Sequence, residues 1–120
     1  MKRGDILGKA SEYVDGPRAD DYGDAFENFE RIAEGWNIIL KNALNTHGYF
    51  TASHVALMMD WVKTARLLHN LESADGWIDK CGYSALGGEC AMKNRERSDY
   101  AKSLIENAAR PRKADDPENV

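Results

Sequence analysis

Two pairs of acidic residues have the spacing that metal chemistry requires. Glu27 and Glu30 are three residues apart in one predicted helix, and Asp75 and Asp79 are four apart in another. Residues three or four apart share a helix face, so each pair presents its two carboxylates together. Hard divalent cations prefer oxygen ligands. If the two helices pack face to face, the four acids are candidate ligands for Mg²⁺ or Mn²⁺.

The first pair also has a simpler interpretation. Together with Glu34, Glu27 and Glu30 lie opposite the main apolar stripe of their helix. A solvated acidic face is the usual arrangement at that position. The metal hypothesis therefore requires a second layer over this face, such as a partner subunit.

The second pair has its own alternatives. Asp79 could be a core acid that pairs with Lys63 or Arg66, because a buried carboxylate is costly unless it is paired or bound to a metal. Asp75 could simply cap its helix. These alternatives stay open beside the metal hypothesis.

Two basic residues are candidates for binding phosphate. Lys63 and Arg66 follow Asp60 in a narrow polar strip of an otherwise apolar helix. They could point into a pocket and hold phosphate oxygens, for which the planar fork of arginine is well suited. The alternative is an ion pair between Asp60 and Lys63 within the helix.

Aromatic residues near the polar segments could contact a nucleobase. The connector 18–24 contains Arg18, a candidate for a phosphate, and Tyr22, which could stack on a base; Trp77 is a second stacking candidate. Ordinary turn chemistry is the alternative for the connector.

Hydrophobic periodicity predicts the helices that must position these groups. The segment 52–70 is apolar nearly all round, which indicates a central, buried helix. No segment indicates a strand. The expected architecture is an all-α bundle of four main helices plus a short N-terminal one, in a single domain over 1–109 with a disordered polar tail over 110–120. The predicted helices cover 5–14, 25–44, 52–70, 76–93 and 98–109; Asp5, Asp24 and Thr51 are the expected N-caps of the first three, and the last begins at Ser98. Gly82, Gly87 and Gly88 indicate that the helix over 76–93 packs tightly.

Composition excludes several functional classes. The 120 residues carry a net charge of −4, which argues against a protein that binds nucleic acid through a basic face. No apolar run is long enough for a membrane span or a secretion signal. Cys81 and Cys90 fall on opposite sides of one predicted helix and have no metal-ligand spacing. We therefore expect a reducing, cytoplasmic environment.

Three sequence blocks, in order, carry a resemblance to a known group. They are D21-Y-G-D with N-F-E-R-I-A-E-G-W36, L57-M-M-D-W-V-K63-T-A-R66-L, and D75-G-W-I-D79-K-C-G-Y83-S-A-L. These blocks resemble small phage and prophage proteins of uncharacterised function. Those proteins are similar to phage nucleotide-modification-associated domains and, more distantly, to the MazG-like all-α nucleoside triphosphate pyrophosphohydrolases.

The resemblance to MazG-like enzymes implies a metal site and a reaction. In that family an E-x-x-E motif and a later E-x-x-D motif hold Mg²⁺ while water attacks a phosphoryl group and pyrophosphate leaves. Glu27-x-x-Glu30 matches the first motif, and Asp79 matches the final acid of the second. The glutamate of the second motif falls on Gly76, and Asp75 is its nearest replacement. By this resemblance Glu30 and Asp79 are the catalytic candidates.

Three functions are therefore compatible with the sequence. The first is a Mg²⁺-dependent pyrophosphohydrolase that acts on a nucleotide in the host cytoplasm. The others are a phage protein that binds a nucleotide without hydrolysing it, and a structural helical protein that binds a partner. A homodimer is expected, because the acidic helix needs a covering layer and the related folds assemble.

Overall fold

The computed structural model describes residues 1–17 and 24–111, and all regular structure within these ranges is helical. The all-α class predicted from the sequence is therefore confirmed. None of the described helices is both long enough and apolar enough to cross a membrane. The helices are α1 (Arg3–Asp15), α3 (Ala25–Thr46), α4 (Ala52–His69) and α5 (Ala74–Ala109).

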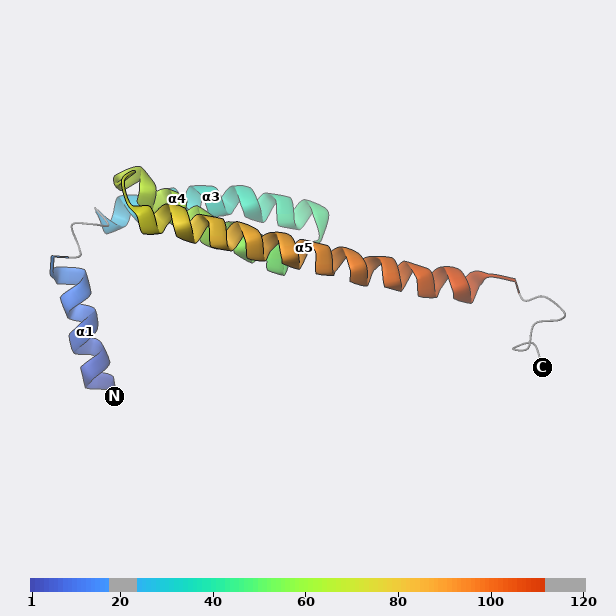
Figure 1. Ribbon diagram of the computed structural model, residues 1–120, viewed down its shortest axis with the longest axis horizontal. Helices are drawn as coiled ribbons and strands as arrows, with labels where there is room; N and C mark the ends of the chain where they lie inside the picture. Colours follow the sequence, from blue (N-terminus) through green and yellow to red (C-terminus); the bar gives the residue numbers. More distant parts are fainter. Residues whose placement is uncertain (18–23, 112–120) are drawn as a thin grey trace.

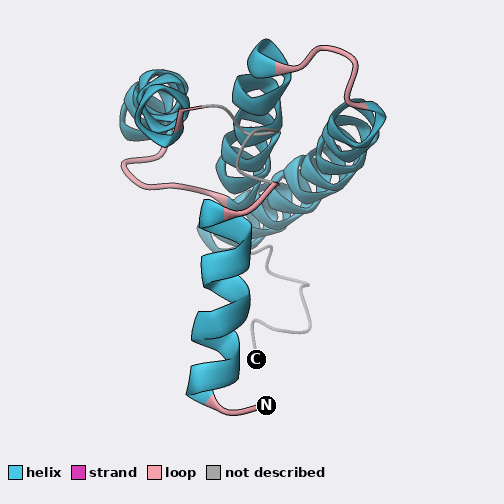
Figure 2. Ribbon diagram, turned by 90° about the vertical axis from the view of Figure 1, so that its left-hand side faces the viewer, coloured by secondary structure: helices cyan, strands magenta, loops and turns pink. Residues whose placement is uncertain are grey.

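The three longer helices form a layer with α4 in the middle. Helix α4 packs against α3 on one side and against α5 on the other (Figure 2). This agrees with the prediction that the most apolar helix is central. Helix α1 stands apart from the layer and buries none of its residues (Figure 1).

The predicted division of the C-terminal region into two helices is wrong. Residues 76–93 and 98–109 belong to the single helix α5, so the described chain has three main helices and one short helix. The segment 93–98 contains neither glycine nor proline, and nothing in it ends a helix. At 1.5 Å per residue α5 is about 54 Å long. Its second half extends beyond the other helices, and residues 95–109 are all exposed (Figure 1).

Local capping chemistry sets where the helices begin. The Asp24 side chain accepts a hydrogen bond from the backbone N–H of Phe26, and the Thr51 hydroxyl accepts one from a backbone N–H in the first turn of α4. Both caps agree with the sequence prediction. The predicted cap Asp5 is wrong: α1 begins at Arg3, and the Asp5 carboxylate accepts from the Lys2 backbone N–H at 2.9 Å.

Two tryptophans join α3 to α4 in a reciprocal arrangement. The Trp36 indole N–H donates to the carbonyl oxygen of Met58 at 2.9 Å, and the Trp61 indole N–H donates to the carbonyl oxygen of Arg31 at 2.7 Å. The Trp61 ring lies directly against Gly35, where a side chain would overlap it. Each helix thus contributes a large ring that hydrogen-bonds the backbone of the other.

Small residues allow α4 and α5 to approach closely. A Cβ atom at Gly76 would lie 2.7 Å from the Leu67 side chain, and one at Gly87 would lie 2.8 Å from Ala56. The sequence predicts close packing from Gly82, Gly87 and Gly88; Gly87 confirms it, whereas a Cβ atom at Gly82 or Gly88 would meet nothing within 4 Å.

The layer leaves much apolar surface open. The chain exposes 9733 Å², whereas a compact monomer of 13.4 kDa exposes about 6,500 Å². The radius of gyration is 22.9 Å, against about 14 Å for a compact chain of this length. Among the described residues the buried hydrophobic set is small: Ala43, Ala65 and Leu67.

Candidate functional site

Two ion pairs cross the junction between α4 and α5. The Lys63 ammonium lies 2.9 Å from the Asp79 carboxylate. The Lys80 ammonium lies 3.0 Å from both carboxylate oxygens of Asp60 and also donates to the Thr64 hydroxyl. In each pair the lysine and the aspartate come from different helices, so the two pairs form polar bridges between α4 and α5.

These bridges decide between the alternatives for two residues. The alternative of an ion pair between Asp60 and Lys63 within α4 is wrong, because each residue pairs with a residue on α5 instead. Asp79 pairs with Lys63, as in the simpler interpretation. The Asp79 side chain is 45% exposed, so this ion pair contributes at most about 1 kcal/mol to stability.

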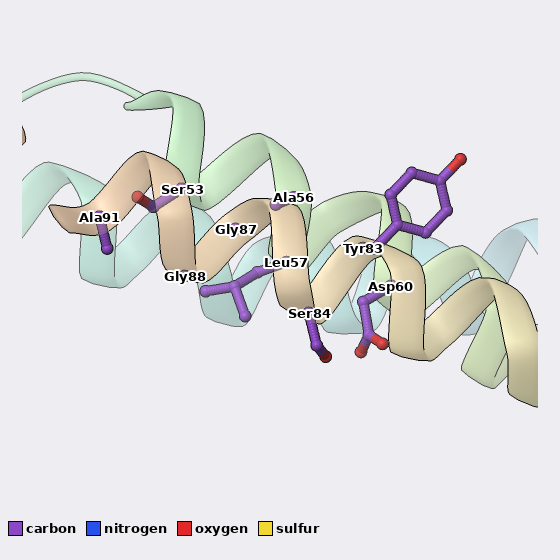
Figure 3. A pocket seen from close by; sticks show the side chains of 9 residues that line it. All are labelled: Ser53, Ala56, Leu57, Asp60, Tyr83, Ser84, Gly87, Gly88 and Ala91. Carbon is purple, nitrogen blue, oxygen red and sulfur yellow. The ribbon is translucent and has the colours of Figure 1, made fainter. Parts of the chain in front are cut away.

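A shallow groove lies between α4 and α5 beside the second bridge. Its volume is about 290 Å³. Asp60 and Tyr83 lie at one end, and Ser53 and Ala91 lie at the other (Figure 3). Ligand pockets usually enclose about 300–1,000 Å³, so the volume of this groove lies at the lower limit of that range. Its lining is made by Ser53, Ala56, Leu57, Asp60, Tyr83, Ser84, Gly87, Gly88 and Ala91.

The four predicted metal ligands do not converge within one chain. Glu27 and Glu30 are exposed on α3, whereas Asp75 and Asp79 lie on α5, on the other side of α4 (Figure 2). Within residues 1–17 and 24–111, no three acids, histidines or cysteines are close enough to hold a metal ion. Asp75 does not cap α5, because Ser73 does so; Asp75 lies in the first turn. A site made of all four acids thus does not fit a single chain.

The remaining predicted residues are spread over the molecule. Arg66 is exposed on α4. Trp77 is half exposed, and its indole N–H donates to the carbonyl oxygen of Leu71 at 2.9 Å, which fixes the ring at the turn between α4 and α5. Arg18 and Tyr22 lie outside the described residues.

A buried histidine network escaped the sequence prediction. His54 is 5% exposed, and its Nδ1 accepts from the Thr51 backbone N–H at 3.0 Å. The ring proton is therefore assigned to Nε2, which donates to the Asn42 side-chain oxygen at 3.0 Å. The His47 ring lies edge-on, 5.5 Å away. The signal was present in the sequence, because His54 is three residues after the cap Thr51, at the N3 position of a capping box.

The fold and these contacts define an all-α protein built on an open layer of three helices. The chain belongs to the family described as "Domain of unknown function (DUF6378)", whose model matches residues 5–91. It is 38% identical over 92 residues to the Gene 55 protein of Mycobacterium phage L5. That match covers 77% of this chain and 56% of the relative, so the chain spans little more than half of the phage protein's length. No solved structure matches the chain.

The comparisons confirm the broader part of the resemblance noted in the sequence. The chain belongs to an uncharacterised family of phage proteins, and the family match over residues 5–91 includes α3, α4 and the first half of α5. The likeness to MazG-like enzymes stays a prediction, and so do the nucleotide, the metal and the roles of the individual residues.

Proposed function

We propose that this protein is a Mg²⁺-dependent nucleoside triphosphate pyrophosphohydrolase that acts on a nucleotide or deoxynucleotide. The observation that supports this proposal most is that the carboxylates of Glu27 and Glu30 are available to bind a metal. Both carboxylates are exposed one turn apart on α3, and neither forms an ion pair with another described residue. Mg²⁺ usually takes only one or two protein carboxylates and completes its shell with water and substrate phosphates.

The proposal reduces the predicted metal set to two residues. Glu27 and Glu30 fit a two-carboxylate site, in which a bound Mg²⁺ would neutralise charge on the phosphates. Asp79 instead holds Lys63 at 2.9 Å and positions that ammonium on the α4–α5 junction. A nucleotide substrate implies action in the cytoplasm of the host cell.

Pyrophosphate release from a panel of ribo- and deoxyribonucleoside triphosphates, with Mg²⁺ or Mn²⁺, tests the proposal. Glu30→Gln keeps the size of the side chain and removes the charge that binds the metal. A loss of roughly 100-fold in rate is expected, since metal charge stabilisation is worth several kcal/mol. Glu34→Gln is the matched control, because Glu34 is exposed one turn further along the same helix. The proposal fails if no nucleotide is cleaved, or if both variants behave alike.

A second candidate function is nucleotide binding without hydrolysis. It is favoured by the two ion pairs, which already neutralise Lys63, Asp79, Lys80 and Asp60 and so resemble structural bridges. This function predicts a rise in melting temperature with a nucleotide, no release of pyrophosphate and little dependence on metal. A purely structural helical protein predicts no thermal shift with any nucleotide.

A further inference from the structure

An apolar stripe runs along α3 and is not covered by any other described helix. At 100° per residue its members fall within an arc of about 60°. Phe26 is 69% exposed and Phe29 is 66% exposed, which is unusual for side chains of this size. We call this set the α3 stripe: Phe26, Phe29, Ala33, Leu40 and Leu44.

The area of open surface suits a second protein chain. The chain exposes roughly 3,000 Å² more than a compact monomer of its mass, an excess to which the isolated helix α1, the free end of α5 and the open face of the layer all contribute. Obligate homodimers bury about 2,000–5,000 Å² in total, or half of that on each chain. The α3 stripe would contribute large exposed side chains to such an interface, since Phe26, Phe29 and Leu44 are 69%, 66% and 56% exposed.

The α3 stripe is complementary to itself when two copies run antiparallel. Phe26 then lies opposite Leu44, and Phe29 opposite Leu40, because both pairs are centred within one residue of Gly35. A large ring thus meets an aliphatic side chain at each end of the seam. An isologous interface requires this property, since the same surface must fit its own copy.

The charged residues beside the α3 stripe are also complementary in the antiparallel arrangement. Glu30 and Lys41 lie on the same edge of the α3 stripe, within about 20° of each other around the helix. Their midpoint also falls within one residue of Gly35, so Glu30 of each copy lies beside Lys41 of the other. Neither residue forms an ion pair with another described residue. The antiparallel pairing therefore places opposite charges together twice.

From these observations we propose that two copies of this chain associate through the α3 stripe as an antiparallel dimer. The dimer does not depend on catalysis. It deepens the proposed function, because it places Lys41 of the second copy next to the acid pair Glu27 and Glu30. An ammonium at that position suits the phosphate oxygens of a metal-bound nucleotide, so each candidate site would contain residues from both chains.

Sedimentation of the full chain over a concentration series tests the dimer. The wild type is expected to sediment as a dimer. Phe29→Glu should raise the dissociation constant by about 100-fold or more, as expected for a large aromatic side chain buried in an interface. Ile38→Glu is the matched control: Ile38 is 69% exposed on the same helix, but it lies on the opposite face, outside the stripe. Helical circular dichroism checks that both variants fold.

A charge exchange tests the antiparallel register. Glu30→Lys or Lys41→Glu alone should weaken association about 10-fold, because each creates two like-charge contacts. The double variant should recover most of the wild-type affinity. A monomeric wild type, an equal effect of Ile38→Glu and Phe29→Glu, or a double variant weaker than both single ones would overturn the proposal. If the wild type forms the dimer but releases no pyrophosphate from any nucleotide, the proposed function is wrong and the dimer proposal stands.

Discussion

Replacing Gly35 by alanine tests the packing of α3 on α4 more sharply than any other single change. In an open helix this replacement stabilises by about 1 kcal/mol, because alanine is the better helix former. At Gly35 the added methyl group overlaps the indole of Trp61. The ring must move, which strains the junction and breaks its hydrogen bond to the Arg31 carbonyl oxygen. Overpacking costs about 1–3 kcal/mol, and the lost hydrogen bond adds about 1 kcal/mol.

The expected net effect is a loss of about 2 kcal/mol in the free energy of unfolding, after the gain in helix propensity is subtracted. Urea denaturation followed by circular dichroism at one fixed protein concentration measures it. Gly88→Ala is the matched control, since a Cβ atom there meets nothing within 4 Å; it should stabilise α5 by up to about 1 kcal/mol. If Gly35→Ala proves as stable as Gly88→Ala, the close contact between Gly35 and Trp61 does not exist.

The other contacts give further expectations. A double-mutant cycle on Lys80 and Asp60, whose side chains are only 23% and 24% exposed, should give a coupling of about 1–2 kcal/mol. The same cycle on Lys63 and Asp79 should give less than about 1 kcal/mol, because Asp79 is nearly half exposed; equal couplings would contradict the burial seen at the two bridges. His54→Ala should cost about 2–3 kcal/mol in urea denaturation, since it removes a buried ring and its hydrogen bonds to Thr51 and Asn42; an unchanged midpoint would show that the network adds nothing.

Those features of the fold that depend only on neighbouring residues could be predicted from the sequence. The side chains of Asp24 and Thr51 cap α3 and α4 because short polar side chains satisfy free backbone N–H groups. The segment 52–70 was expected at the centre because a helix that is apolar nearly all round must be covered on several sides. Both features follow from neighbouring residues, so the sequence contained enough information.

Other features depend on contacts that a sequence pattern does not contain. The continuity of α5 through Ser98 was missed, because serine is compatible with a helix interior as well as with a cap. An ion pair between Lys63 and Asp60 at helical spacing was one of two alternatives, but each residue pairs with a residue on α5 instead. Spacing identifies which side chains share a face, and only the packing of the helices decides which charges meet.

In the candidate site, too, the spacing of residues predicted which side chains share a helix face, but not which helices meet. The spacing of Glu27 and Glu30 correctly places them on one exposed face of α3. Their convergence with Asp75 and Asp79 required α3 and α5 to face each other, whereas α4 separates them (Figure 2). The order of helices in a layer depends on tertiary packing, which helical periodicity does not determine.

A crystal structure of the protein grown with Mn²⁺ and a non-hydrolysable nucleoside triphosphate analogue tests the central claim most directly. Anomalous scattering locates the Mn²⁺ ions directly and distinguishes them from water. We expect a peak at the carboxylates of Glu27 and Glu30, with the nucleotide phosphates completing the coordination and Lys41 of a second copy beside them. A bound nucleotide with no metal at these two acids, or Mn²⁺ bound elsewhere, would contradict the proposed function.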